Sequence, residues 1–378
     1  MVENKDKKVL NVPHLRFPEF SGEWEETTLG KISEITKGSG MSKDQLSEQG
    51  SPCILYGELY TKYKSEIIDE VYSRTELDSS SLVKSKANDV IIPCSGETAI
   101  DISTARCVPF NNILLGGDLN IIRLNQDDGG FFAYQLNGAR KKDIARVAQG
   151  VSVVHLYGEN LKHIRVYHPV VEEQKKITRL LSLIDERIAT QNKIIEKLQS
   201  LIKGLAAQLT QSGTPNIRLC DCLECHSSTL QENCVSVTGS YPVYGATGLI
   251  GYTNNYAYSG ESILIVKDGS GVGSLSYVND HFSVIGTLNY LTAKEKHSIL
   301  YLYYALMAFN FTPYITGMAI PHIYFKDYGK AKLFYPSNEK RIRITSLLHN
   351  IEQKLVVEQN LVISLSAQKS YLLRMLFI

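Results

Sequence analysis

Two stretches of the chain carry apolar side chains at alternating spacings of four and three residues. One follows Pro169 and the other follows Pro336, and each pattern lasts for about five heptads. This spacing places the apolar side chains on one face of a helix and is typical of helices that pair lengthwise. We therefore predict two helices of about 40 residues, each about 60 Å long. The predicted seam consists of Ile177, Leu181, Ile184, Ile188, Gln191, Ile195 and Leu198 in the first helix and Ile344, Leu348, Ile351, Leu355, Glu358, Val362 and Leu365 in the second.

The two helical stretches belong to a longer internal repeat. Residues 150–211 align without a gap with residues 317–378 when the chain is shifted by 167 positions. An ungapped match of this length indicates a tandem duplication, in which each copy has a variable globular part followed by a common tail. The matched pairs include Gly150 with Gly317, His155 with His322, Tyr157 with Tyr324, and Pro169 with Pro336. Weaker matches pair Leu119-Asn120 with Leu288-Asn289 and the spacing of Leu29, Ile32 and Ile35 with that of Leu219, Cys222 and Cys225.

The segment between the helices determines their relative direction. A single amphipathic stripe is most simply a helix packed on its own domain, but two matched stripes of equal length favour pairing with each other. Residues 212–321 form one domain of modest size, with a radius of gyration of about 13 Å, which would have to reach back about 60 Å to make the helices parallel. We therefore predict an antiparallel pair, in which the polar seam residues Gln191 and Glu358 fix the register.

These observations predict an α+β fold in which two mixed α/β domains are separated by a long antiparallel two-helix coiled coil with pseudo-two-fold symmetry. The predicted boundaries are residues 1–154 for the first domain, 155–211 for the first tail, 212–321 for the second domain and 322–378 for the second tail.

Composition is that of an ordinary globular protein, with 43% apolar and 21% charged residues. No apolar run approaches the roughly 18 residues that a membrane span requires, so we expect a cytoplasmic protein that contacts no membrane. Seven cysteines, an odd number, fit free thiols in a reducing compartment.

The charge pattern does not by itself indicate a nucleic-acid-binding protein. Residues 1–150 carry 18 basic and 22 acidic side chains, and residues 212–321 carry 4 and 7. Nonspecific affinity for phosphates depends mainly on Lys and Arg. If the chain binds DNA tightly, partner proteins are expected to supply much of the electrostatic attraction.

Motifs for catalysis or metal binding are weak. The cysteines between Cys220 and Cys225 suggest zinc, but they do not form two regular CxxC pairs, and two of them match Ile32 and Ile35 of the first copy. We therefore expect no metal. The glycines of residues 269–273 follow a strand-like run and precede another, which predicts a hairpin turn rather than a nucleotide loop. Adenine-methyltransferase, Walker and nuclease signatures are not found in the sequence, so we expect no enzymatic activity.

Several short motifs follow one another along the chain. They are Val12–Phe20 with Trp24, Tyr56–Tyr63, Gly116–Asp118, Gln149-Gly150 leading into Leu156-Tyr157, and Pro169 with Glu173–Ile177. Their order, the duplication and the paired heptads resemble the specificity subunits of type I restriction-modification enzymes, and the resemblance covers nearly the whole chain. The second copy departs from the pattern where Lys340-Arg341 replaces Glu173-Gln174.

The resemblance implies a protein that recognises double-stranded DNA and catalyses no reaction. Two target-recognition domains would read two half-sites about one helical turn apart in the major groove. Because residues 20–150 and 212–316 differ in sequence, the bipartite target is expected to be asymmetric. The resemblance also implies two methyltransferase subunits, which carry S-adenosylmethionine and methylate adenine, and two endonuclease and translocase subunits, which use ATP and Mg. This chain is expected to bind no cofactor.

Base recognition requires exposed donors and acceptors, which we expect on loops of both domains. The second domain has few basic residues but 11 of the 22 tyrosines, so its contacts are expected to rely on aromatic and amide groups. The candidates in the first domain are Lys37, Ser39, Lys43, Tyr60, Thr61, Lys62, Tyr63, Lys64, Ser95, Glu97, Thr98 and Arg106. Those in the second are Tyr244, Thr247, Tyr252, Asn254, Asn255, Lys267, Asp268 and Ser270.

Two other functions remain open at this point. A coiled-coil scaffold that joins two protein-binding modules would explain the repeat and the helices without any role for DNA. A zinc-dependent enzyme would require stoichiometric metal.

Overall fold

The computed structural model describes residues 10–294 and 296–378, so the charged start of the chain, residues 1–9, lies outside the described part. The chain divides into two compact units, each with a sheet domain and part of each long helix. Unit 1 combines the residues up to Gln191 with Leu361–Ile378, and unit 2 is Asn192–Asn360. The predicted α+β class is confirmed. The predicted boundaries at residues 154, 211 and 321 divide the chain by sequence copy and remain a prediction.

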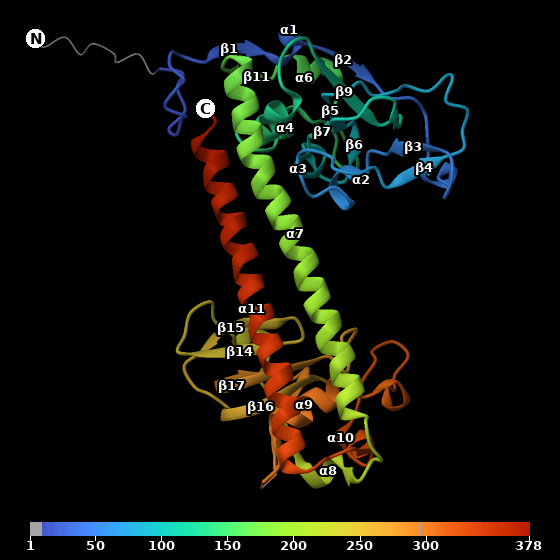
Figure 1. The fold of residues 1–378 in the computed structure, drawn as a ribbon, viewed down its shortest axis with the longest axis vertical. Helices are drawn as coiled ribbons and strands as arrows, with labels where there is room; N and C mark the ends of the chain where they lie inside the picture. Colours follow the sequence, from blue (N-terminus) through green and yellow to red (C-terminus); the bar gives the residue numbers. More distant parts are fainter. Residues whose placement is uncertain (1–9, 295) are drawn as a thin grey trace, which may run out of the picture. The chain divides into compact units, whose positions relative to one another are not determined.

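Unit 1 is built on an antiparallel sheet of four strands in the order β2-β9-β5-β7 (Figure 1). All five residues of β5 are buried, because Val90 and Ile92 face one core while Ile91 faces a second. Helix α4 covers the first core, and the carboxylate of Asp128 caps its N-terminus by accepting a hydrogen bond from the backbone of Phe131. A three-stranded sheet, β4-β3-β8, borders the second core.

The elements of unit 1 outside the long helices are β1 (Glu25–Thr28), α1 (Leu29–Ile32), β2 (Ser33–Lys37), a 3-10 helix (Lys43–Gln45), β3 (Ser51–Ile54), α2 (Glu58–Thr61), β4 (Ser73–Thr75), β5 (Asp89–Pro93), β6 (Ser95–Gly96), α3 (Ala99–Ile102), β7 (Arg106–Val108), β8 (Leu114–Leu115), β9 (Leu119–Leu124), α4 (Gly129–Asn137), α5 (Lys141–Val147), β10 (Val154–His155), α6 (Gly158–Lys162) and β11 (Arg165–His168). Strand β1 pairs with β11, and β6 pairs with β10.

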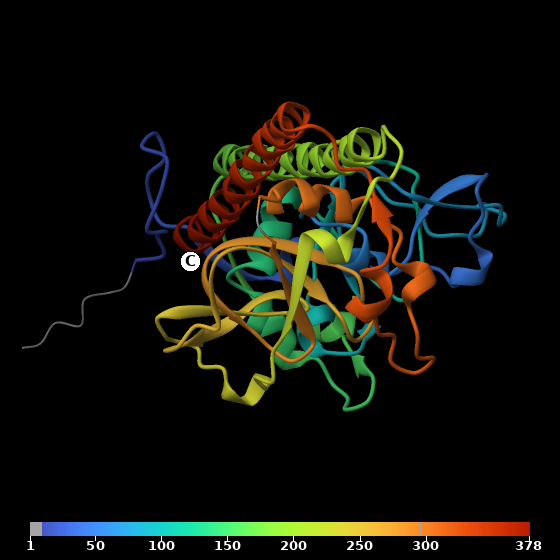
Figure 2. The same cartoon turned by 90° about the horizontal axis from the view of Figure 1, so that it is seen from below.

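Unit 2 has a six-stranded sheet in the order β13-β18-β16-β17-β14-β15. All its pairings are antiparallel except that of β14 with β17. Helix α9 lies between this sheet and the long-helix segments of the unit (Figure 2), and its residues share one core with both. Residues 267–274 join the antiparallel strands β16 and β17, so the predicted glycine-rich hairpin turn is confirmed.

The elements of unit 2 outside the long helices are β12 (Ile217–Arg218), α8 (Leu219–Cys222), β13 (Leu223–Ser227), a 3-10 helix (Glu232–Cys234), β14 (Tyr241–Gly245), β15 (Gly248–Thr253), β16 (Tyr258–Val266), β17 (Leu275–Val284), β18 (Leu288–Ala293), α9 (Ile299–Met307), a 3-10 helix (Thr312–Tyr314), α10 (Phe325–Tyr328) and β19 (Lys332–Leu333). Strand β12 pairs with β19, as β1 pairs with β11 in unit 1.

The faint sequence echoes correspond to equivalent elements of the two units. Leu29 and Leu219 begin the equivalent helices α1 and α8, and the strands β2 and β13 follow directly. Leu119 and Leu288 begin β9 and β18. The parallel pair β3-β8 of unit 1 is matched by β14-β17 of unit 2. The duplication therefore includes the sheet domains as well as the tails.

The two predicted helices are α7 (Val171–Thr210), with 40 residues, and α11 (Asn338–Met375), with 38 residues. None of the helices in the described part of the chain has the length and apolar composition needed to cross a membrane. Every residue of the predicted seam is buried or half-buried. Ile177, Leu181, Ile184, Gln191, Ile344 and Leu348 are buried, and the other seam residues are half-buried.

Packing within each unit shows that the helices are antiparallel. In unit 1, Leu372 near the end of α11 shares a core with Ile177 near the start of α7. In unit 2, Ile344 near the start of α11 shares a core with Ala206 near the end of α7. The predicted direction of the pair is therefore confirmed, and each unit packs its own sheet domain on a pair of helix segments.

Candidate nucleic-acid interface

Strand ends that meet at one edge of the sheet of unit 1 bring together most of the candidate residues. Lys37 at the end of β2 pairs with Asn120 in β9, and Pro93 at the end of β5 pairs with Leu119. Two strands therefore end where β9 begins. We call this the candidate edge of unit 1, defined by Lys37, Pro93 and Leu119. Loops that leave a sheet at such an edge are the usual place for binding residues on a rigid scaffold.

Four of the predicted DNA-contacting residues line one cavity beside this edge. Lys43 comes from the 3-10 helix after β2, and Tyr60, Thr61 and Lys62 come from α2 and the residue after it. The cavity has a volume of about 510 Å³. It offers two ammonium groups and two hydroxyl groups, which suit phosphate oxygens and base edges.

A buried carboxylate beside the cavity neutralises one of these lysines. Glu58 is 5% exposed and accepts hydrogen bonds from the backbone NH of Leu55 and the hydroxyl of Ser73. Its Oε1 lies 2.6 Å from Nζ of Lys62. The charge of Lys62 is therefore partly neutralised by Glu58 within the domain. Lys43 is exposed and is the stronger candidate for a phosphate contact.

The phenol of Tyr60 is held in its protonated form. Burial raises the pKa of Tyr60, and the nearby Tyr56, Glu97 and Asp101 act in the same direction. A protonated phenol both donates and accepts a hydrogen bond. Tyr60 can therefore contact either a phosphate or a base.

The sequence search missed Asp118, which also lines the cavity. Its Oδ2 accepts a hydrogen bond of 2.9 Å from Oγ of Ser95. The loop that carries Asp118 lies against the loop after β2, because Gly38 leaves room: a Cβ at Gly38 would lie 1.9 Å from the carbonyl oxygen of Gly116. A carboxylate here suits the amino group of a cytosine and disfavours a phosphate. The Gly116–Asp118 motif was visible in the sequence, but its closeness to Lys43 was not.

Three candidates of the first domain are buried, and the expectation that they face DNA from exposed loops is wrong. Arg106 is 8% exposed, lies in β7 and donates a hydrogen bond of 2.9 Å to the carbonyl oxygen of Tyr63. Tyr63 is 3% exposed. Ser95 is 8% exposed and donates to Asp118. The guanidinium group of Arg106 and the hydroxyl of Ser95 each have a hydrogen-bond partner within the domain, so they do not need solvent.

The other candidates of unit 1 are exposed or half-buried, and two of them shape loops. Oγ of Ser39 accepts a hydrogen bond of 2.9 Å from the backbone NH of Val83. Oγ1 of Thr98 caps α3 by accepting a hydrogen bond of 3.1 Å from the backbone NH of Asp101. The residues that remain exposed at or near the candidate edge are Lys37, Lys43, Tyr60, Thr61, Lys62, Lys64, Glu97 and Thr98.

Unit 2 has an equivalent candidate edge. Val266 at the end of β16 pairs with Leu288 at the start of β18, and Ser227 at the end of β13 pairs with Asn289. We define the candidate edge of unit 2 by Ser227, Val266 and Leu288. The sequence echo between Leu119-Asn120 and Leu288-Asn289 therefore marks the same edge in both domains.

The candidates of unit 2 fall into two groups. Lys267, Asp268 and Ser270 leave the candidate edge in the turn after β16, and Nζ of Lys267 lies 4.0 Å from Oδ2 of Asp268. Tyr244 is joined to this region because its carbonyl oxygen accepts a hydrogen bond from the backbone NH of Ile285. Thr247 lies in the turn between β14 and β15. Tyr252, at the end of β15, and Asn254 and Asn255, in the loop that leads to the start of β16, lie apart from this edge.

Much of the tyrosine content of the second domain serves packing. Tyr301, Tyr303 and Tyr304 of α9 are 0%, 7% and 0% exposed. The ring of His226 stacks on that of Tyr290 with centroids 4.8 Å apart. The tyrosine count therefore overstated the aromatic surface available to DNA.

The cysteines of the second domain belong to its core. Cys222 is fully buried in the α8 turn, and Cys225 is half-buried on β13. Burial raises the pKa of both thiols to about 11, so they remain protonated. The described residues contain no group of three His, Cys, Asp or Glu side chains placed to hold a metal ion.

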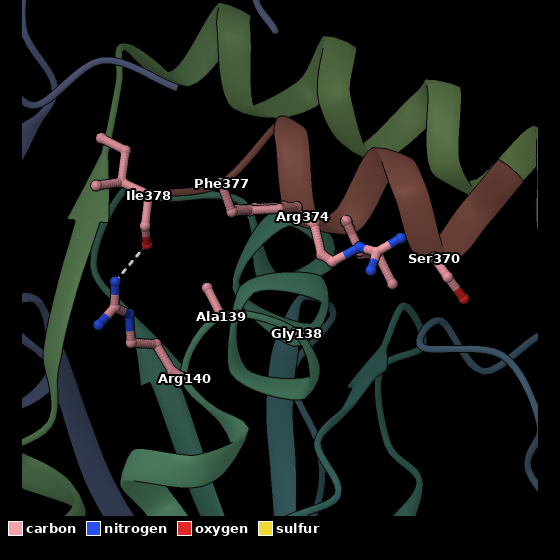
Figure 3. A pocket seen from close by; sticks show the side chains of 8 residues that line it. Gly138, Ala139, Arg140, Ser370, Arg374, Phe377 and Ile378 are labelled. Atoms are coloured by element: carbon pink, nitrogen blue, oxygen red, sulfur yellow. Dashed lines mark hydrogen bonds between the residues drawn. The ribbon is translucent and has the colours of Figure 1, made fainter. Parts of the chain in front are cut away.

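Another hollow lies in unit 1 away from the candidate edge, at the end of α11. Its volume is about 460 Å³. Figure 3 shows Arg140, from the loop after α4, donating a hydrogen bond to the carbonyl oxygen of Ile378, while the side chain of Arg374 points elsewhere. In unit 2 the equivalent junction has Gln211 donating to the carbonyl oxygen of Ala308. Each of these two hydrogen bonds attaches a sheet domain to residues at the end of a long helix.

Comparison with known families gives a match over most of the chain. The model of the type I restriction modification DNA specificity domain matches residues 21–200 and 217–365. The type I restriction enzyme MjaVIII specificity subunit of Methanocaldococcus jannaschii is 23% identical over 212 residues, which are 55% of this chain and 46% of that protein. The type I restriction enzyme EcoprrI specificity subunit of Escherichia coli is 26% identical over 112 residues, 30% of this chain and 28% of that protein. The matches to curated relatives span between 23% and 46% of those proteins.

The fold also resembles a solved structure. The crystal structure of a type I restriction-modification S subunit from M. genitalium has a TM-score of 0.69 and 18% sequence identity, and the match covers 97% of this chain and 99% of that one. At this identity the likeness concerns the fold.

Proposed function

The chain belongs to the family of type I restriction modification DNA specificity domains, and on that basis we propose that it selects the DNA site of a type I restriction-modification enzyme. Each sheet domain reads one half-site from its candidate edge. The target is bipartite, with a gap that neither domain reads, because the two domains are packed on separate segments of the helix pair.

One observation carries this proposal. The two units share the same strand framework, but the polar residues at their candidate edges differ. The strands β9 and β18 begin with the same Leu-Asn pair in both units. The loops around them differ: unit 1 presents Lys37, Lys43 and Asp118, whereas unit 2 presents Lys267 and Asp268. A common scaffold with unlike polar groups suits two half-sites of different sequence.

The same repeat supports a symmetric arrangement of partners. Two equivalent tails provide two equivalent surfaces, which suits two copies of one methyltransferase subunit. We propose that these subunits bind S-adenosylmethionine and methylate adenine, that two endonuclease and translocase subunits use ATP and Mg, and that the assembly acts in the cytoplasm. This chain itself contributes recognition without catalysis.

Because the recognition domains are nearly neutral in charge, we expect the partner subunits to make many of the contacts with phosphates. Of the lysines at the cavity of unit 1, Lys62 is paired with Glu58, and Lys267 of unit 2 lies near Asp268. Few unpaired cations remain at the candidate edges. We therefore expect weak DNA binding by the chain alone and tight binding only in the complex.

Methylation sequencing of a host that carries this chain with its methyltransferase tests the proposal. The expected result is one bipartite, asymmetric adenine-methylation motif. Exchange of residues 20–150 for the corresponding segment of another specificity subunit should change one half of the motif and leave the other half intact. A motif that survives the exchange unchanged, or no motif at all, would contradict the proposal and favour a scaffold that joins two protein-binding modules.

A further inference from the structure

A short hairpin precedes the tail in each copy of the repeat. Hairpin 1 is residues 149–155 of unit 1, and hairpin 2 is residues 316–322 of unit 2. The end residues of hairpin 1 exchange two backbone hydrogen bonds of 2.8 and 2.7 Å, and those of hairpin 2 exchange bonds of 2.9 and 2.8 Å. Both hairpins are therefore closed at the base, and their tips are held out from the domain.

A glycine at the same position gives both hairpins their shape. Gly150 has φ +121° and Gly317 has φ +87°, a region that other residues rarely adopt. A Cβ at Gly150 would lie 2.1 Å from the carbonyl oxygen of Val153, and one at Gly317 would lie 2.3 Å from that of Ile320. The two tips are thus equivalent in backbone as well as in sequence position.

Both tips present apolar side chains to solvent. Val151 is 97% exposed and Val153 is 53% exposed; their equivalents Met318 and Ile320 are 105% and 66% exposed. Neither hairpin contains a Lys, Arg, Asp or Glu residue. Two equivalent, exposed apolar tips indicate that each one is covered by a binding partner.

Each hairpin lies beside the candidate edge of its own unit. In unit 1, Val154 of hairpin 1 pairs with Gly96, directly before the exposed Glu97 and Thr98. In unit 2, the backbone NH of Gly269 donates a hydrogen bond of 2.9 Å to the carbonyl oxygen of Pro321 in hairpin 2. The apolar tips therefore continue the polar surface that carries the base-reading candidates.

We propose that hairpins 1 and 2 enter a groove of the bound DNA beside the two half-sites, where Val151, Val153, Met318 and Ile320 contact base edges and sugars. This inference rests on the proposed function. Phosphates are unsuitable partners for uncharged apolar tips, whereas thymine methyl groups and unstacked base faces suit them. Continuity with both candidate edges favours DNA over a protein partner as the occupant.

The test uses the complex of the full chain with its methyltransferase and a duplex that carries the motif found by methylation sequencing. The variants are Val151→Ser, Met318→Ser and the double variant. Because these side chains are almost fully exposed, the substitutions should leave the fold intact. Val237→Ser is the matched control, since Val237 is 90% exposed and lies outside both hairpins. Val151→Ile keeps the tip apolar and should restore wild-type binding.

We expect each serine variant to raise the Kd by about tenfold, the cost of one lost groove contact. The slope of log Kd against log salt should stay unchanged, because no phosphate contact is lost. Wild-type affinity in the double variant would overturn the inference. Loss of the methyltransferase from the purified complex would also overturn it, since the tips would then dock a protein. A wild-type complex without sequence preference would instead contradict the proposed function itself.

Discussion

The ammonium group of Lys369 lies 2.6 Å from Oδ1 of Asp185 and thereby joins α11 to α7 inside unit 1. The same ammonium group lies 2.5 Å from Oε2 of Glu66, in the sheet domain. All three side chains are largely buried, with 14%, 8% and 10% exposed. One cation therefore links the sheet domain of unit 1 to both helix segments on which the domain packs. The four-three apolar spacing of the second helix continues past Leu365 to Leu372 and is broken at Lys369, and such breaks commonly serve specificity of packing.

Replacement of Lys369 by methionine should destabilise the protein. The change fills a similar volume but leaves Asp185 and Glu66 buried without their cation, so we expect the free energy of unfolding to fall by about 3 kcal/mol. Unfolding in urea measures it. The control is Lys354→Met on the same helix, where the lysine is 62% exposed and pairs with Glu358; it should cost less than about 1 kcal/mol. Equal losses in the two variants would contradict a structural role for the buried cluster.

A tyrosine contacts a helix carboxylate at equivalent positions of the two repeats. The hydroxyl of Tyr134 donates a hydrogen bond of 2.7 Å to Asp185, and that of Tyr304 donates one of 2.7 Å to Glu352. In unit 2, the hydroxyl of Tyr303 also reaches Glu352, at 3.1 Å. Each sheet domain is thus attached to its helix segments by an equivalent tyrosine–carboxylate hydrogen bond, buried in unit 1 and part-buried in unit 2.

A double-mutant cycle should detect this attachment in unit 2. We expect Tyr304→Phe and Glu352→Gln to be coupled by about 1–2 kcal/mol, since removal of one partner leaves the other buried group unsatisfied. Urea unfolding of the four proteins gives the coupling. Tyr303→Phe, whose hydrogen bond to the same carboxylate is longer, provides the comparison and should couple less. Additive effects for Tyr304 and Glu352 would show that the hydrogen bond does not contribute to stability.

Stability should depend on pH through His168 and Asp127, whose Nδ1 and Oδ1 atoms lie 3.1 Å apart. The hydrogen bond to Asp127 raises the pKa of His168, although burial opposes this. Burial acts to raise the pKa of Asp127, but hydrogen bonds from His168 and Gln174 outweigh it and lower that pKa. Because the pKa of His168 is higher in the folded state, its stabilising effect is complete below about pH 6.5 and is lost as the pH rises through the folded value.

Urea unfolding of wild type and His168→Gln from about pH 5.5 to 9 tests this dependence. The difference in free energy of unfolding should be largest at the acid end of that range and shrink as the pH rises. Asp127→Asn should weaken the same dependence, because it removes the charge that favours the protonated imidazole. On the acid side, the contribution of Asp127 is lost as the pH falls through its lowered folded pKa. A constant difference across the range would rule out this charge pair as the cause.

Periodicity in the sequence was enough to predict the helix pair, the length of the intervening domain predicted its direction, and the glycine-rich run predicted the hairpin after β16. The faint match of Leu119-Asn120 with Leu288-Asn289 also marked the equivalent candidate edges. These features depend on local spacing and on chain length, which a single sequence carries.

The buried contacts of charged side chains could not be predicted from the sequence, and the reason is physical. Lys369 looked like a simple break in the heptad seam, because its partner Asp185 is 184 positions away in the sequence. Arg106 looked like an exposed cation, because its hydrogen-bond acceptor is the backbone of Tyr63 in another segment. Burial of a charged side chain depends on remote partners, which residue type and local pattern do not reveal. The exposed tips of the two hairpins likewise became visible only once burial was known.

The salt dependence of DNA binding should distinguish exposed lysines of the candidate edge from buried or remote cations. Lys37 lies at the candidate edge of unit 1 and Lys43 lines the cavity beside it, and both are exposed. A phosphate contact by each would add about 0.9 to the slope of log affinity against log salt. We therefore expect Lys37→Ala and Lys43→Ala each to lower that slope by about one in the complex with the methyltransferase. Lys86 is an exposed lysine before the start of β5, at the opposite end of the strand, so Lys86→Ala is the matched control.

Arg106→Ala tests whether this arginine stabilises the core of the domain or contacts a DNA phosphate. Its guanidinium group is buried and lies near the carboxylates of Glu66 and Asp185. The substitution should therefore lower the free energy of unfolding by about 3 kcal/mol, as loss of a buried ion partner does. Binding measured on the fraction that remains folded should keep the wild-type salt slope. If Arg106→Ala instead lowered the slope while stability stayed unchanged, the arginine would have to leave the core and contact DNA. If the slope of log affinity against log salt were unchanged in Lys37→Ala and Lys43→Ala, the partner subunits would have to make the phosphate contacts of this half-site instead.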